Sequence, residues 1–179
     1  FLGLAPKEKS PHHSSLTTIR QRLPLAVHQE MFTKILAIAE GHDLLDGSLL
    51  ATDSTTLEAN AAMKSIVRRA SGEDWTAYIT RLAEEAGIEE PTPQELRRFD
   101  RKRKGRKTSN KEWTSRTDAE ARIARMKDGR THLAYKAEHA VDLTTEIIVA
   151  AQVYHADVTD PNTLLETLAT AQGNLEGAG

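Results

Sequence analysis

The order of its periodic segments predicts an α/β fold for this chain of 179 residues. Three observations carry that prediction. An apolar run at 49–52 leads into Asp53 and a cluster of small hydroxyl residues, as expected of a strand buried on both faces that ends in a polar tip. Apolar and polar side chains alternate over 131–142, and a nearly continuous apolar run follows at 147–154, so the two segments predict an antiparallel hairpin. Segments with helical spacing lie before, between and after these strands.

The region 1–47 is expected to be helical after an N-terminal linker. Residues 1–15 contain Pro, Ser and the adjacent His12 and His13. A His pair invites a metal interpretation, but neighbouring His point in different directions and no third ligand is suitably spaced, so exposed loop residues are the favoured interpretation. A short helix is predicted over 16–23, capped by Ser.

A second helix is predicted between Pro24 and Gly41, where apolar residues recur at helical spacing. Its expected core-facing stripe consists of Val27, Met31, Ile35, Ile38 and Ala39, widened by Phe32 and Leu36.

Three helices and a loop are expected in the segment 61–130, which separates the first strand from the hairpin. One helix is predicted over 59–69 and a second over 75–86. A third begins at a capping box, Thr92 to Glu95, with Pro93 as its first residue, and should bury Leu96 and Phe99. The Gly- and Ser-containing stretch 105–116 predicts a loop that is mobile without a partner. Trp113 in that loop would either stack on a base or act as a hydrophobic anchor.

The last element predicted is a helix capped by Asp160, with Pro161 at its first position. The core face of this helix is expected to consist of Leu164, Leu165, Leu168 and Ala169.

Charge is distributed very unevenly along the chain. Residues 97–116 hold ten Lys or Arg against two acidic residues, whereas the formal net charge of the whole chain is -2. Such a block indicates a polyanion partner, with a solvated face as the alternative. The acidic stretch 73–95 could partly neutralise it. The candidate DNA-binding residues are Arg97, Arg98, Arg101, Lys102, Arg103, Lys104, Arg106, Lys107 and Lys111.

Asp53 is the candidate metal ligand, because a strand that delivers one carboxylate among small hydroxyl residues is a common way to present such a group. The alternative is that Asp53 only caps a turn. Glu58 is not a second ligand, since a side chain five positions along a strand points to the opposite face.

The segment 44–69 resembles part of a known protein family. Its sequence is LLDGSLLATDSTTLEANAAMKSIVRR. The run resembles the segment around the first catalytic Asp of bacterial insertion-sequence transposases of the DDE type, in which Asp begins the pattern D-[SGA]-T-x-[IL]-x-A-N-A. The residues that match it are Asp53, Thr55, Leu57, Ala59, Asn60 and Ala61. The segments RIARMKDGRTHLAYKAEHAVD and VYHADVTDPNTLLETL resemble the next two strands and the following helix of that family. In the hairpin turn, Glu146 stands where family members usually have Gly.

The resemblance implies that 48–179 is the N-terminal part of an RNase H-like catalytic domain, whose first three strands are antiparallel. The segment 61–130 would be a helical and basic insertion, and 1–47 would be a DNA-binding-like region. Family members cut and join double-stranded DNA, at the element's terminal repeats and at the target, by in-line attack on phosphorus with two Mg²⁺ or Mn²⁺ ions. Asp53 would be the first of three ion-binding carboxylates, while Asp142 and Asp160 match structural positions. The other two carboxylates are expected beyond Gly179, so residues 1–179 by themselves are expected not to cleave DNA. Self-association is a further expectation.

Two other function classes remain open. A stand-alone nucleic-acid-binding module would explain the basic block but not the residues around Asp53. A different RNase H-like nuclease would explain Asp53 but not the long insertion or the N-terminal helices. The chain has no Cys and no apolar run of the roughly 20 residues that span a bilayer, so a cytoplasmic protein without a membrane partner is expected.

Overall fold

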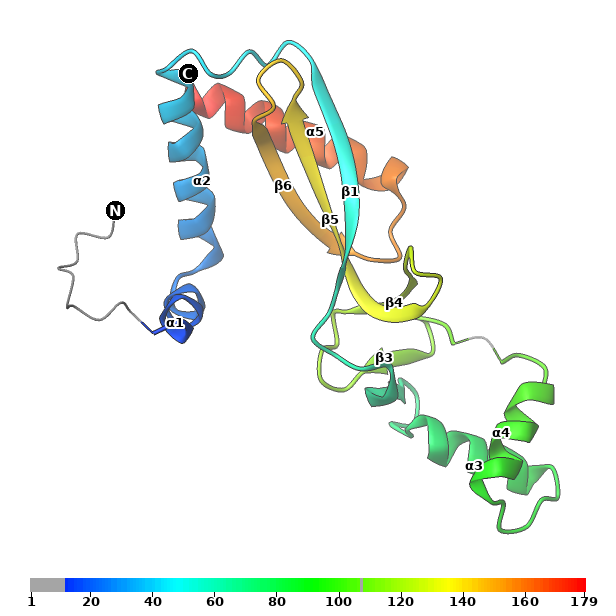
Figure 1. Cartoon of the computed structure of the whole chain (residues 1–179). Helices are drawn as coiled ribbons and strands as arrows, with labels where there is room; N and C mark the ends of the chain where they lie inside the picture. Colours follow the sequence, from blue (N-terminus) through cyan, green and yellow to red (C-terminus); the bar gives the residue numbers. More distant parts are fainter. Residues whose placement is uncertain (1–11, 107) are drawn as a thin grey trace.

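The computed structural model describes residues 12–106 and 108–179, so most of the predicted N-terminal linker and Lys107 lie outside it (Figure 1). It is a mixed α/β structure with antiparallel sheets, as predicted. The elements in chain order are α1 (Ser14–Arg22), α2 (Leu25–Glu40), β1 (Leu50–Glu58), the 3₁₀ turn η1 (Met63–Ser65), β2 (Ile66–Arg68), α3 (Trp75–Glu85), α4 (Pro93–Lys102), β3 (Trp113–Ser115), β4 (Arg122–Arg125), β5 (Thr131–Asp142), β6 (Ile148–His155) and α5 (Asp160–Ala178).

The long strand β5 organises the main sheet. Along one edge it pairs with the whole of β1, from Leu50 opposite Asp142 to Glu58 opposite Ala134. Along its other edge it pairs first with β4 and then with β6, and all of these pairings are antiparallel. The predicted hairpin is therefore confirmed. Glu146 in its turn has φ of 62°, a left-handed backbone that favours Gly.

The buried face of β5 is the polar one, contrary to the prediction. Lys136, Glu138 and Asp142 are 5%, 3% and 0% exposed; α5 packs over the first two, and Asp142 is enclosed by the segment before β1 and the hairpin turn. The apolar face of β5 is buried mainly near its start, where Leu133 packs with Ile66 and Trp113. Charged side chains tolerate this burial only because each has hydrogen-bonding partners.

The core face predicted for α5 is also wrong. Leu164 and Leu165 are exposed, whereas Thr163, Thr167 and Ala171 are buried against the sheet. The two Thr hydroxyl groups donate hydrogen bonds to the Glu138 carboxylate, at 2.6 and 2.7 Å. A polar helix face thus matches a polar strand face.

Helix α2 has the predicted bounds but packs through only one edge of the predicted stripe. Leu36, with Phe32 beside it, lies in a cluster with Val149 and Ala171, so α2 rests on α5 and β6. Met31, Ile35 and Ile38 of the predicted core stripe are exposed instead. Helix α1 begins at Ser14, two residues earlier than predicted, and no side chain caps it.

The helix predicted over 59–69 does not form. This segment contains η1 and β2, and β2 pairs with β3. Ile66 is buried against Trp113, and the Arg68 guanidinium lies 4.5 Å from the ring centroid of Tyr78 and 5.4 Å from that of Trp113. Contacts with residues far along the chain therefore override the local helical pattern.

The loop predicted over 105–116 is partly ordered. Trp113 is buried in β3, so it is a hydrophobic anchor and does not present its ring for stacking on a base. The Asn110 side chain bonds both backbone groups of Ile123 and the carboxylate of Asp157, which fixes the loop to the sheet.

Helices α3 and α4 form a pair that projects from the main sheet (Figure 1). Both agree with the prediction. The capping box between Thr92 and Glu95 is present, and Leu96 and Phe99 pack against Ile79 on α3. In the described part of the chain, no helix is long and apolar enough to cross a membrane.

Candidate functional site

Asp53 lies in the middle of β1, not at the end of the strand as predicted, and it is exposed. The strand itself is half-buried at most, not covered on both faces. The Oδ1 atom of Asp53 accepts a hydrogen bond of 2.8 Å from the backbone N–H of Ser54. No turn occurs there, so the interpretation of Asp53 as a turn cap is wrong. Its strand partner is His139.

Asp53 and its neighbour Ser54 point to opposite faces of β1. The Ser54 hydroxyl donates a hydrogen bond of 3.0 Å to Asp160 at the start of α5, so Asp53 lies on the face away from that helix. In the described structure no strand pairs with the other edge of β1. A cavity of about 270 Å³ opens beside this free edge of β1, where Asp53 borders it together with Thr52, Ser54, Glu138, Asp160, Pro161 and Leu164.

The other two carboxylates that line this cavity, Glu138 and Asp160, both form ion pairs with Lys136. Lys136 Nζ lies 2.7 Å from Asp160 and 2.8 Å from Glu138. The hydrogen bond from Lys136, followed by that from Ser54, lowers the pKa of Asp160. Burial raises the pKa of Glu138, but hydrogen bonds from Lys136 and Thr163 outweigh it and the net pKa is lowered. Asp160 thus has a structural role, although Thr159 is the N-cap residue and Asp160 is not.

Asp142, the other carboxylate with an expected structural role, is fully buried in the hairpin. It accepts backbone N–H groups from Asp46, Gly47 and Thr144 at 2.8 to 2.9 Å. Burial alone would raise the pKa of Asp142, but these hydrogen bonds outweigh burial and lower the pKa to about 2. Asp142 therefore joins the segment before β1 to the turn after β5.

The described residues alone do not fit a divalent metal site. Within them no group of three or more His, Asp or Glu side chains could hold an ion, and Mg²⁺ needs several oxygen ligands in octahedral geometry. Asp53 is one carboxylate without a partner of that kind. His12 bonds Ser14 and belongs to no metal group either.

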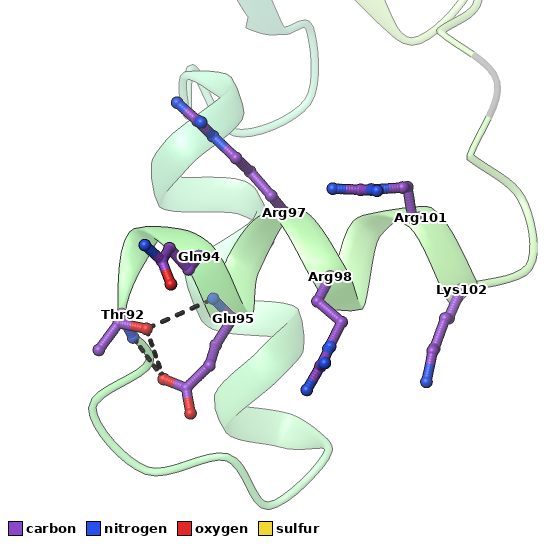
Figure 2. Close-up of a pocket in the computed structure, with 7 residues that line it drawn as sticks. All are labelled: Thr92, Gln94, Glu95, Arg97, Arg98, Arg101 and Lys102. Atoms are coloured by element: carbon purple, nitrogen blue, oxygen red, sulfur yellow. Dashed lines mark hydrogen bonds between the residues drawn. The ribbon is translucent and has the colours of Figure 1, made fainter.

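The second predicted site, the basic block, is centred on α4. Arg97, Arg98, Arg101 and Lys102 are exposed around a hollow of about 820 Å³ that Gln94 also lines (Figure 2). We call these four residues the α4 cations. The opposite side of α4 is buried by Leu96 and Phe99, so the hydrophobic contact with α3 orients the cations outward.

Only part of the predicted DNA-binding set belongs to this surface. Asp100 binds Arg103 at 2.6 Å and Arg106 at 3.3 Å, which commits these two cations to the end of α4. Lys104 and Lys111 are exposed in the segment after α4, and Lys107 is outside the described residues. Gln94 was missed by sequence reasoning, although its helical spacing from Arg97 and Arg101 could have found it.

The acidic stretch contributes one carboxylate to this surface, because Glu95 lines the same hollow as the α4 cations. Glu73 and Glu85 bind Arg81 on α3, at 2.9 and 2.8 Å. Glu95 is held by Thr92, whose hydrogen bond lowers the pKa of Glu95, with a smaller contribution from the charge of Arg98. Four cations against one carboxylate give the lining of this hollow a net positive charge, which favours a polyanion.

No protein-family model, no curated protein and no solved structure matches this chain.

Proposed function

We propose that this chain is part of a DNA transposase of the DDE type, which binds the ends of an insertion sequence and cuts and joins DNA with two Mg²⁺ or Mn²⁺ ions. The observation that carries the proposal is the position of Asp53. It is an exposed carboxylate in the middle of β1, in an antiparallel arrangement of β1, β5 and β6 with α5 on the opposite face. This arrangement supports the RNase H-like fold that the sequence resemblance implies.

Asp53 is proposed as one ion ligand among several. The described residues do not complete a metal site, so no catalytic step is assigned to them alone. The remaining carboxylates would come from parts of the protein outside these residues. Because bacterial transposases act on chromosomal DNA, the proposal also places the protein in the cytoplasm.

The α4 cations are proposed to bind DNA through its phosphates. Four phosphate contacts would give a slope of about -3.6 in a plot of log affinity against log salt concentration. Between about 50 and 200 mM salt, affinity would then fall by roughly a hundredfold.

This DNA binding is tested by fluorescence anisotropy with a labelled duplex across a salt series. Arg97→Ala, Arg101→Ala and Lys102→Ala combined should reduce the slope by about 2.7. A control variant with the same loss of charge replaces Arg125, Lys127 and Arg130, which are exposed around the turn between β4 and β5, and should keep the wild-type slope. Equal slopes for the two variants would show that the α4 cations do not contact DNA.

A second candidate function is a stand-alone nucleic-acid-binding module. The ion pairs that Lys136 forms with Glu138 and Asp160 favour it, because these two carboxylates line the cavity beside β1 and are not free to join Asp53 in binding an ion. Both candidates predict DNA binding. They differ in whether Asp53 is needed for cleavage.

A further inference from the structure

We propose that α4 enters the major groove of B-form DNA, with its cations facing the two phosphate walls of the groove. This inference rests on the proposed DNA binding and adds how the duplex is held.

The α4 cations form two rows. Figure 2 shows Arg97 and Arg101 extending to one side of the helix and Arg98 and Lys102 to the other. Within each row the two residues are four positions apart, about 6 Å along the helix axis. At about 100° per residue, Gln94 falls between the rows near the start of the helix. A surface that met a single flat array of phosphates would need only one such row.

The dimensions of a helix fit this groove. A helix with its side chains is about 10–12 Å across, and the major groove of B-form DNA is about 12 Å wide. The major groove of A-form RNA is deep and narrow and does not admit a helix in this way. A single strand offers no pair of phosphate walls. The two rows therefore favour duplex DNA.

Helix α4 is also positioned and rigid enough to enter a groove. The α3–α4 pair projects from the main sheet, so the sheet does not block the approach (Figure 1). The capping box fixes the first turn of α4, and the pairing of Arg103 with Asp100 fixes the last. Leu96 and Phe99 hold the helix on α3. Little ordering entropy would be lost on binding.

The side chains that point into the groove suit base edges. A Gln amide can form paired hydrogen bonds with adenine, and an Arg guanidinium can do so with guanine. Gln94, Arg97 and Arg101 extend over about 10 Å along the axis, which is close to three base-pair steps of about 3.4 Å. We therefore assign Gln94 to the floor of the groove. The row of Arg97 and Arg101 is assigned to one wall, from which its guanidinium groups can also reach base edges.

The test compares one duplex in two forms, with cytosine or with glucosylated 5-hydroxymethylcytosine, which fills the major groove and leaves the phosphates unchanged. The full 179-residue chain should bind the filled duplex about tenfold or more weakly. The Arg97→Ala and Lys102→Ala double variant, checked for retained helix by circular dichroism, should lose most of that difference. The minor-groove ligand netropsin should leave binding unchanged.

The other possible results would overturn either the groove assignment alone or the proposed DNA binding as well. Equal affinity for the filled and unfilled duplexes, or equally tight binding of a double-stranded RNA of the same sequence, would overturn the groove assignment and leave DNA binding intact. Displacement by netropsin would place the contact in the minor groove and would also overturn it. Absence of salt-dependent binding to the unmodified duplex would remove both this inference and the proposed function.

Discussion

Replacing Asp142 by Asn should destabilise the fold substantially while keeping the shape of the side chain. The carboxylate is fully buried and receives three backbone N–H groups, from Asp46, Gly47 and Thr144. Its pKa is lowered from 3.8 to about 2. One pKa unit corresponds to about 1.4 kcal/mol, so ionised Asp142 contributes about 2 kcal/mol at neutral pH. An Asn amide also turns an N–H donor toward one of the three N–H groups, which raises the expected loss to about 2–4 kcal/mol.

The sign of the pH dependence follows from the lowered pKa of Asp142. Its contribution is complete above the unfolded-state pKa, near 3.8, and is lost as the pH falls toward about 2. The difference in stability between wild type and Asp142→Asn should therefore shrink over that window.

The assay for Asp142 is urea unfolding followed by circular dichroism from pH 7 down to pH 2. Asp43→Asn is the matched control, because Asp43 is exposed and its φ of 54° suits Asn. A loss below about 0.5 kcal/mol for Asp142→Asn at pH 7, or a difference from wild type that does not change with pH, would contradict the anchoring role.

Two further predictions concern the elements that support the sites. Lys136→Met should cost about 3–5 kcal/mol in urea unfolding, because Glu138 would remain buried without its cation, and adding Glu138→Leu should recover part of the loss. A stability close to that of wild type for the single variant would contradict this. Thr92→Ala should remove the capping box and weaken the protection of α4 amides from hydrogen exchange by about 1 kcal/mol, whereas Thr108→Ala should leave it unchanged. Equal exchange in both variants would refute the cap.

Local sequence signals predicted most of the element order. The capping box of Thr92 located α4 to the residue, and the alternation along 131–142 gave β5 with the bounds that the structure shows. Both signals are complete within a few residues of chain. Gly87, with φ of 84°, likewise follows the end of α3 as predicted.

The orientation of these elements was harder to predict, because it depends on distant partners. The polar face of β5 is buried since Glu138 meets Thr163 and Thr167 on α5, and no local pattern encodes that match. The stretch 59–69 contains a 3₁₀ turn and the strand β2 in place of a helix, because Ile66 meets Trp113, 47 positions later. Hydrophobicity alone assigned the wrong face in α5, and in α2 it predicted a stripe that contained the buried Leu36 but was too wide.

The sequence was enough to choose the candidate residues but not to predict which of them pair with one another. The residues around Asp53 and the density of Lys and Arg over 97–116 were enough to select Asp53 and the α4 cations as candidates. The pairing of Arg103 and Arg106 with Asp100 depends on how the chain turns after α4, which residue spacing does not specify.

The central claim, that Asp53 is a catalytic metal ligand, is tested most directly by Mg²⁺-dependent strand cleavage with Asp53→Asn. In the proposed transposase the other carboxylates lie outside these residues, so the assay uses the polypeptide encoded by the whole reading frame and a DNA that carries the element's ends. We expect cleavage to fall by several orders of magnitude, because Asn keeps the shape but removes the charge, while salt-dependent DNA binding and thermal stability stay within error of wild type. Near-normal cleavage by Asp53→Asn would exclude Asp53 from the catalytic site.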